Sequence, residues 1–446
     1  MSASPFDSAI HRQLFGDAEL GRLFSDTAEI RAMMLVLGAL AKTQGKLGVI
    51  PEVSGAFLAR AMMEIQIDPA GLADSVGQNG VSVPGLVAAL RKALEAPEHA
   101  AWLHWGATSQ DIQDSALMLR LRQALALIEA RLITSLGRLA DLAEAEAETP
   151  MAARTYGQLA VPSSLGAMMA AWGWPVLRAV ERLGALRPRL AVSLSGAGGT
   201  GSMLGEDPAA IRAALAEALG LADPGRSWHA DRTIITELAE ICAAVTVAGA
   251  KAGEDLLLLT RSDVAELRLG GGGASSTMPQ KENPIGPSVL VALARFASAQ
   301  GAALGPAHRE ARDGAGWFTE WLVVPGLVLA AGKSASVLGD SLAQLAPDRA
   351  GMAARIDARP ALIHAEALSF ALARQMPRPE AQAEVKRLAG EARRTNRPLP
   401  ELVGEAYPDL DLSRLASLGQ APAEARAFAR AARQIGDGQG RGVNLD

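Results

Sequence analysis

The sequence is poor in cysteine, in histidine and in aromatic residues. Cys242 is the only cysteine among 446 residues, which excludes an intramolecular disulfide framework. Its apolar neighbours predict a buried thiol in a reducing compartment, so we expect a cytoplasmic protein. The six histidines are dispersed and no pair has the spacing of a zinc-binding helix, so we expect neither a metal nor a cofactor.

Positive charge and long apolar runs are also scarce. The net charge is −5 and the pI is near 5.8, which provides no basic surface for nucleic acid. The N-terminus has no charged-then-apolar signal pattern, and the longest apolar stretches are too short and too often broken by proline to span a bilayer. We therefore expect no nucleic-acid partner and no membrane, and any anionic ligand must meet local positive charge.

Apolar residues, by contrast, make up 49% of the chain and recur at helical spacing, which predicts an all-α fold. The longest pattern runs from about Asp111 to Glu148 and predicts a helix of roughly 57 Å at 1.5 Å per residue. Its apolar face consists of Leu121, Leu125, Ile128, Leu132, Leu136 and Leu139.

Four more long helices are predicted, one after Trp228 and the others over about 161–188, 285–304 and 317–345. Five long helices indicate a bundle. Changes in pattern and proline content divide the chain into three helical domains, residues 1–110, 111–347 and 348–446. Helices this long need partners along their length, so oligomerisation is expected, although a monomeric bundle remains an alternative.

A glycine-rich segment, SGAGGTGSMLGE, matches the dinucleotide-binding pattern through Gly196, Gly198 and Gly201. A dinucleotide-binding domain needs alternating strands and helices, whereas long predicted helices flank this segment. The sequence favours a loop between helices.

Polar residues cluster at the predicted start of the longest helix, in HWGATSQDIQDSA. Thr108, Ser109 and Asp111 are suited to capping the helix, and a helix N-terminus with free N–H groups and hydroxyls also binds carboxylates. His104 is equally consistent with a structural histidine. Capping and ligand binding both remain open.

A second polar cluster lies in MAARTYGQLAVPSSLG, where Arg154, Thr155, Tyr156 and Gln158 interrupt an apolar neighbourhood. This pattern indicates directed hydrogen bonds more than solvation.

The stretch GGGGASSTMPQKENP, residues 270–284, combines flexible glycines with Ser275, Ser276 and Lys281. By composition it is either a linker or a mobile loop that carries chemistry.

SSTMPQKENP closely resembles the signature of the fumarase/aspartase superfamily and differs from it only by Ala274 in place of glycine. HWGATSQD and ARTYGQLAVPSSLG resemble two regions of the adenylosuccinate lyase branch, in the same order along the chain. With WHADRTIITELAEI and REARDGAGWFTEW, the resemblance covers most of the chain.

The resemblance implies three helical domains, a homotetramer with active sites shared between subunits, and a closing loop over residues 268–284. It implies that Ser275 transfers a proton, while Lys281 and Asn283 stabilise negative charge on a substrate carboxylate. It also implies a set of substrate-binding residues, of which Arg154 and Arg312 are equally consistent with structural ion pairs: His104, Thr108, Ser109, Arg154, Thr155, Tyr156, Gln158, Ser276, Met278 and Arg312.

Two departures bear on the reaction. Tyr156 stands where lyases of this branch that expel an amine have a histidine, and a carboxylate with a pKa near ~4 needs no such proton donor. GQNGVSVPGLV replaces the His-Asp-Val-Val pattern of the branch. Both departures resemble its cycloisomerases, which add a carboxylate of a small polycarboxylate substrate across a C=C bond. A C–N lyase and a catalytically inactive structural relative of the superfamily remain alternatives.

Overall fold

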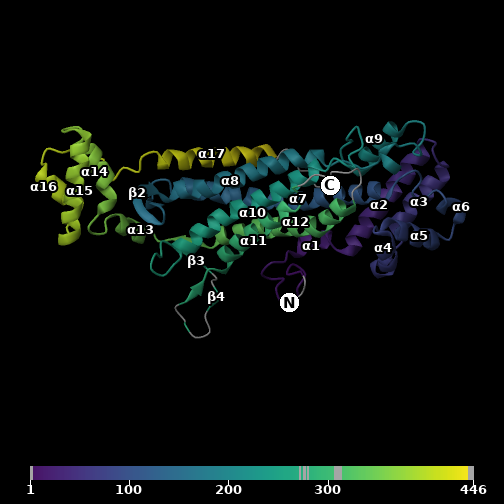
Figure 1. Ribbon diagram of the computed structural model, residues 1–446, viewed down its shortest axis with the longest axis horizontal. Helices are drawn as coiled ribbons and strands as arrows, with labels where there is room; N and C mark the ends of the chain where they lie inside the picture. The colour runs from purple at the N-terminus through teal and green to yellow at the C-terminus, as the bar shows by residue number, and fades with distance from the viewer. Residues whose placement is uncertain (1–3, 271–272, 275–277, 279–280, 306–313, 440–446) are drawn as a thin grey trace. The chain divides into compact units, whose positions relative to one another are not determined.

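The computed structural model describes residues 4–270, 273–274, 278, 281–305 and 314–439. Over these residues the chain forms seventeen α-helices and only short antiparallel strand pairs (Figure 1). The predicted all-α fold is therefore confirmed.

Five long helices correspond to the five that the sequence predicts. They are α7 (Ser109–Ala145), α8 (Leu165–Leu186), α10 (Thr233–Leu259), α11 (Ile285–Ala302) and α12 (Gly314–Ala343). All six apolar residues of the predicted α7 face are buried, each with at most 1% of its surface exposed. Because the 3.6-residue period places these side chains on one stripe, the periodicity alone located the buried face.

The chain divides into two compact units. The first comprises Met1–Arg131, Ala179–Val247 and Ala292–Ser336, and the second comprises Leu132–Arg178, Ala248–Val291 and Val337–Asp446. The division into three domains at residues 110 and 347 remains a prediction.

The first unit contains a helical subdomain with its own apolar core. Helix α2 packs against α3 and α9, and Leu37, Leu58 and Leu86 are among the fully buried residues. The shorter elements of this unit are α1 (Ala18–Leu23), α2 (Asp26–Lys46), α3 (Glu52–Glu64), η1 (Pro69–Leu72), α4 (Ala73–Asn79), α5 (Val83–Leu94), α6 (Pro97–Ala100), η2 (Arg187–Arg189), η3 (Ala197–Gly199) and α9 (Pro208–Leu219).

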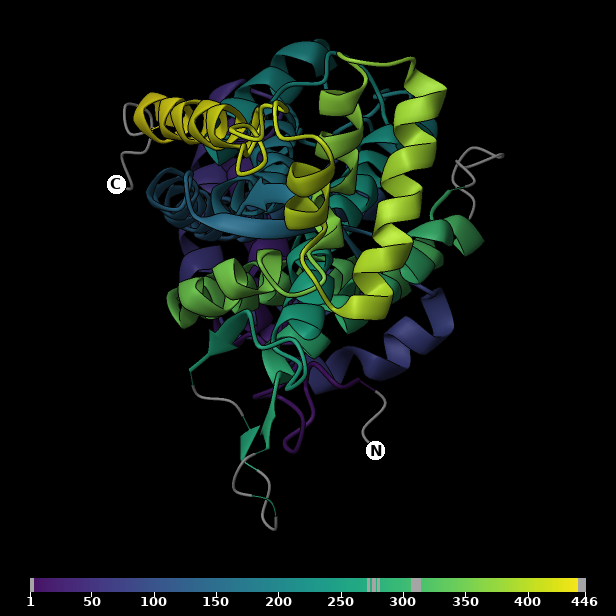
Figure 2. The same cartoon turned by 90° about the vertical axis from the view of Figure 1, so that its left-hand side faces the viewer.

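The second unit contains the strand pairs and the C-terminal helices. Helices α14 and α15 lie side by side around a small apolar core (Figure 1, Figure 2). The shorter elements of this unit are β1 (Pro150–Thr155), β2 (Gln158–Ser164), β3 (Leu267–Leu269), β4 (Gly273–Ala274), β5 (Glu282–Asn283), β6 (Leu345–Pro347), α13 (Arg349–Ile356), η4 (Leu362–His364), α14 (Ala365–Leu372), α15 (Arg378–Thr395), α16 (Leu399–Ala406) and α17 (Ala421–Gln439).

The β1–β2 hairpin is the main difference from the predicted elements, since the sequence placed the start of a helix at about residue 161. Tyr156 and Gly157 form a two-residue turn in which both residues have positive φ, 51° and 72°. This backbone matches the right-handed twist of a hairpin, so the chain reverses there and the helix begins only at Leu165.

Two helices, Thr233–Leu259 and Gly314–Ala343, are long and apolar enough to cross a membrane by length and composition alone. In the most apolar window of each helix, 56% and 67% of the residues are buried within the protein. Core helices of bundles have the same composition.

Gly166 marks a close approach of α8 to α7. A Cβ atom there would lie 2.4 Å from the carbonyl oxygen of Ala143 and 2.7 Å from the Cα atom of Ala147. We expect Gly166→Ala to lower the free energy of unfolding by about 1–3 kcal/mol, because backbone atoms cannot yield as a side chain does. Urea denaturation measures the change.

Gly137→Ala is the matched control, since Gly137 is an exposed residue of α7 whose Cβ would meet nothing within 4 Å. It should raise the free energy of unfolding by about 0.5–1 kcal/mol. Equal effects of the two substitutions would contradict the close approach.

Candidate active site

The segment before α7 contains the first group of predicted site residues. His104 and Gly106 have positive φ, 65° and 70°, and a Cβ atom on Gly106 would lie 2.3 Å from the carbonyl oxygen of Met203. The turn therefore needs glycine at this position. The turn places Thr108 and Ser109 at the N-terminus of α7. Backbone N–H groups at a helix N-terminus are favourable for binding a carboxylate.

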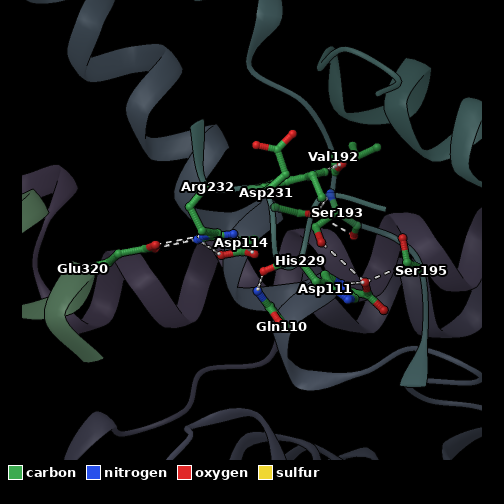
Figure 3. Close-up of polar contacts among 12 residues, drawn as sticks. Gln110, Asp111, Asp114, Val192, Ser193, Ser195, His229, Asp231, Arg232 and Glu320 are labelled. Carbon is green, nitrogen blue, oxygen red and sulfur yellow. Dashed lines mark hydrogen bonds and ion pairs between the residues drawn. The ribbon is translucent and has the colours of Figure 1, made fainter. Parts of the chain in front are cut away.

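The carboxylate of Asp111 holds this segment in place. It accepts hydrogen bonds from the backbone N–H groups of Thr108 (2.9 Å), Ser195 (2.8 Å) and Gly196 (2.9 Å), and it lies 2.7 Å from Nε2 of His229 (Figure 3). Asp111 is completely buried. One side chain thus joins three segments that are far apart in the sequence.

The pKa of Asp111 follows from these contacts. Burial alone raises the pKa, but the hydrogen bond and charge of His229 and the N–H donors of Thr108 and Ser195 outweigh burial, so the pKa lies below its usual value. Asp111 is therefore ionised at neutral pH. Its negative charge in the first turn also complements the dipole of α7.

The glycine-rich segment that matches a dinucleotide motif has a structural role here. Its backbone N–H groups at Ser195 and Gly196 point to Asp111, and Gly196, Gly198 and Gly201 all have positive φ. Over the described residues every sheet is a two-stranded antiparallel pair, whereas a dinucleotide-binding domain needs a parallel sheet. The loop interpretation agrees with this geometry.

His104 is half-buried near the start of α7. Burial lowers the pKa of its imidazole, and this effect exceeds the opposing hydrogen bond with Thr108 and the charge of Asp111. Among the described residues its Nε2 atom has no hydrogen-bond partner. A neutral imidazole with one unused nitrogen is suited to contacting a ligand at the N-terminus of α7.

A buried charge cluster lies one helical turn further along α7. Arg232 forms two hydrogen bonds with Asp114 (2.7 and 2.9 Å) and two with Glu320 of α12 (Figure 3). Burial alone lowers the pKa of Arg232, but the two carboxylates outweigh it, so the pKa is raised and the guanidinium stays charged. The cluster ties α7, α10 and α12 together within the first unit.

The β1–β2 hairpin contains the second group of predicted residues. Thr155, Tyr156 and Gln158 are exposed at its tip, and the Tyr156 side chain is fully exposed. The positive φ of Tyr156 is the value that the two-residue hairpin turn requires. These side chains are thus presented outward from their unit.

Arg154 is bound within its own unit. Its guanidinium forms a bidentate pair with Glu266 at 2.8 and 2.6 Å, and Arg355 lies 2.9 Å from the same carboxylate. Glu266 is buried. Of the two alternatives for Arg154, the structure contains the ion pair, and substrate binding by this residue stays a prediction.

The third group lies at the signature loop. Gly273 and Ala274 of β4 pair with Glu282 and Asn283 of β5, which holds the two ends of the loop together. Figure 1 shows β4 standing out from the helices of its unit. Ser275, Ser276 and Arg312 lie outside the described residues, as do Gly271 and Gly272.

A groove runs beside this strand pair in the second unit. Met278, Lys281 and Asn283 line it together with Arg261 and Arg268. Met278 and Lys281 are exposed, and the Lys281 N–H donates to the carbonyl of Met278 at 3.0 Å. Asp263 and Glu282 line the same groove, and Arg261 pairs with Asp263 at 2.8 Å. The described lining thus carries three cationic and two acidic side chains, a net charge of +1, which favours an anion only modestly.

The predicted residues thus lie in separate places. His104, Thr108 and Ser109 belong to the first unit, whereas the hairpin and the signature loop belong to the second. Sequence reasoning missed the partners of Asp111, above all His229, because Asp111 was interpreted only as a helix cap. The sequence His-Ala-Asp at 229–231 marks His229 as a candidate functional residue. It does not indicate that the partner of His229 is Asp111, 118 positions earlier.

Comparisons with known proteins show the family of the chain. A lyase family model matches residues 23–297, which is more than half of the chain. The chain belongs to this lyase family, within the fumarase/aspartase superfamily, and is an enzyme by that membership.

Three relatives illustrate the similarity. The chain is 38% identical over 402 residues to a 3-carboxy-cis,cis-muconate cycloisomerase from Pseudomonas aeruginosa, covering 88% of this chain and 87% of the relative. It is 32% identical over 426 residues to a nitrosuccinate lyase from Streptomyces davaonensis, covering 91% and 88%. The crystal structure of a 3-carboxy-cis,cis-muconate lactonizing enzyme from Pseudomonas putida superposes with a TM-score of 0.88 at 29% identity, covering 96% of this chain and 100% of that one.

The depressed pKa of Asp111 generates a testable pH dependence. A lowered pKa stabilises the folded state fully above the unfolded-state value of about 3.9, and this stabilisation is lost as the pH falls through the folded-state value. Asp111→Asn leaves backbone donors without a charged acceptor. It should lower the free energy of unfolding by roughly 1–3 kcal/mol or more between pH 5 and 7. The difference from the unmodified protein should shrink below about pH 4.

Urea denaturation over a pH series measures this difference. Asp409→Asn at an exposed position is the control and should change the free energy of unfolding by less than about 0.5 kcal/mol. A cost of Asp111→Asn that stays constant down to pH 3 would contradict the ionised, hydrogen-bonded carboxylate.

Proposed function

We propose that this enzyme is a 3-carboxy-cis,cis-muconate cycloisomerase, which converts its substrate to 4-carboxymuconolactone by intramolecular addition of a carboxylate across a C=C bond. The observation that carries the proposal is the 38% identity, over 88% of the chain, to the Pseudomonas aeruginosa enzyme of that name. The substrate is a small polycarboxylate of protocatechuate breakdown by the β-ketoadipate pathway, and we place the enzyme in the cytoplasm.

We propose the following course of reaction. One carboxylate oxygen attacks an alkene carbon and forms the C–O bond of the lactone. The electron pair of the double bond moves toward the neighbouring carbon and its carboxylate, which becomes an aci-carboxylate. Ser275 supplies the proton to that carbon, while Lys281 and Asn283 stabilise the negative charge. Holding the substrate curled for ring closure supplies much of the rate acceleration.

The properties of the described residues support these roles. Lys281 is an exposed cation on a groove whose described lining carries one net positive charge, which favours a carboxylate. The β4–β5 pairing holds the two ends of the loop in register, so Asn283 and the adjacent Lys281 would move with the loop as it closes. Ser276 and Met278 would contact the substrate from the same loop.

The remaining substrate carboxylates would bind at two other places. Thr108 offers a hydroxyl, and Ser109 a hydroxyl and an N–H group, at the N-terminus of α7, with His104 beside them. Thr155, Tyr156 and Gln158 present polar groups from the hairpin tip. Arg312 remains a candidate for charge complementarity, whereas Arg154 would act by orienting the hairpin through Glu266.

We further propose a homotetramer in which each active site combines residues of several subunits. The hairpin tip is exposed on its own unit, and a fully exposed Tyr156 with positive φ gains a role only when another surface meets it. Sharing of sites between subunits would provide that surface.

A C–N or related β-eliminating lyase is the second candidate function. The 32% identity to the nitrosuccinate lyase favours it, because that similarity covers 91% of the chain. Tyr156 in place of histidine favours carboxylate addition over elimination of an amine, since an amine is a basic leaving group that benefits from a proton donor and a carboxylate needs none.

Turnover of 3-carboxy-cis,cis-muconate tests the proposal directly. Addition across one double bond interrupts the conjugated diene, so the ultraviolet absorbance of the substrate should disappear with time when enzyme is added. Adenylosuccinate, argininosuccinate and nitrosuccinate are assayed in parallel. Consumption of one of these without consumption of the muconate would refute the cycloisomerase assignment.

Ser275→Ala tests the proton-transfer role, with Ser276→Ala as the matched control. Loss of a positioned proton donor should lower kcat by about 10²–10⁴-fold, whereas removal of the neighbouring hydroxyl should cost less than about 10-fold. Size-exclusion chromatography verifies that both variants keep the oligomer. The opposite order of effects would assign the proton transfer to Ser276.

A further inference from the structure

The carboxylate of Glu266 is shared by two arginines within the second unit. Only 1% of Glu266 is exposed, and its bidentate pair with Arg154 joins it to β1, the first strand of the hairpin. Nε of Arg355 in α13 lies 2.9 Å from the same carboxylate. One buried anion therefore holds two cations from segments that are far apart in the sequence.

The backbone of Glu266 lies at the base of the signature loop. Its N–H donates to the carbonyl of Leu259 at the end of α10, and its carbonyl accepts a hydrogen bond from the N–H of Asp348 just before α13, both at 3.0 Å. Strand β3 begins at the next residue, Leu267, and pairs with β6 before the chain reaches the glycines of the loop. Glu266 thus belongs to the backbone that supports this loop.

Arg154 lies at the corresponding place in the hairpin, two residues before the turn residue Tyr156. The strand register shifts between Ala152 and Arg154, and such irregularities redirect the side chains beside them. Helix α13 also packs against β1, where Ala152 and Ile356 belong to one buried apolar cluster. The base of the hairpin and α13 therefore meet next to the Glu266 cluster.

The charge balance makes Glu266 the necessary member of this cluster. The side chains of Arg154 and Arg355 are only 12% and 33% exposed. The charge of Arg355 also acts on Asp263, but Asp263 is exposed and pairs with Arg261. Without the Glu266 carboxylate, the two guanidiniums that share it would repel each other and turn toward water. Such a movement would displace β1 from β3.

We propose that Glu266 is a positioning residue that couples the hairpin tip to the base of the signature loop. The inference rests on the proposed function, in which both segments meet the substrate. Because Glu266 directly precedes β3 and binds Arg154 of β1, it fixes the spacing between these two strands. Glu266 is buried and bound by two arginines, so it acts through Arg154 and the β3 backbone and not by contact with the substrate.

Hydrogen exchange of the full-length protein, followed by mass spectrometry, tests the coupling. Glu266→Gln should raise the exchange rate by about 10-fold or more in two separate segments, 150–164 and 262–270. Arg154→Gln alters only the hairpin side of the pair, and it should also raise the exchange rate in 262–270. Glu384→Gln is the matched control, since Glu384 accepts two hydrogen bonds from Arg387 within α15, at 2.9 and 2.7 Å. It should leave both segments unchanged.

Turnover of 3-carboxy-cis,cis-muconate gives the functional readout. Glu266→Gln should lower kcat/KM by about 10²-fold, because a small displacement of positioned groups costs about this much, and it should both lower kcat and raise KM. A purely structural loss would reduce the amount of active enzyme and leave KM unchanged. Glu266→Asp keeps the charge and should retain at least about 10-fold more activity than Glu266→Gln.

Glu266→Asp is also the second variant if Glu266→Gln does not fold, and both segments should exchange several-fold faster in it because the shorter side chain cannot reach both arginines. Faster exchange in the hairpin alone, or an equal rise in all segments of the second unit, would overturn the coupling. Unchanged exchange in both segments would overturn it as well. Exchange is measured without substrate, so a lack of muconate turnover refutes the proposed function alone, and the exchange pattern still decides the coupling.

Discussion

The buried carboxylate of Asp111 is the contact on which the candidate site of the first unit depends. It accepts hydrogen bonds from the loop before α7 and from the glycine-rich segment, and it pairs with His229. A buried carboxylate without these donors would be strongly unfavourable, so the three segments are stable only when they meet. The position of Thr108 and Ser109 at the start of α7 follows from that requirement.

Buried charge recurs in both units with the same effect. Arg232 bridges Asp114 and Glu320 in the first unit, and Glu266 binds Arg154 and Arg355 in the second. Breaking such a cluster by removing one partner typically costs about 3–5 kcal/mol, because a buried charge is left uncompensated. The apolar helix faces drive packing, and these charge clusters select which loops and helices come together.

The candidate catalytic groups are arranged differently from these structural charges. Tyr156, Met278 and Lys281 are exposed. Tyr156 lies at a hairpin tip, and Met278 and Lys281 lie in a loop whose ends form a short strand pair. The residues proposed to contact the substrate are accessible, whereas Asp111 and Glu266, which hold the neighbouring segments, are buried.

The sequence alone determined the helical class, the five long helices and the family. The reason is that helical periodicity and a long signature are local properties, readable from neighbouring residues such as the buried series from Leu121 to Leu139. It also identified the candidate residues by type, but left Arg154 open between substrate binding and an ion pair.

Only the tertiary structure decided the contacts between distant residues. It placed Arg154 on Glu266, His229 on Asp111 and the glycine-rich N–H groups on the same carboxylate, and it folded residues 150–164 into a hairpin. The three side-chain contacts have no local signal, because a hydrogen bond between residues about a hundred positions apart depends on how whole helices pack.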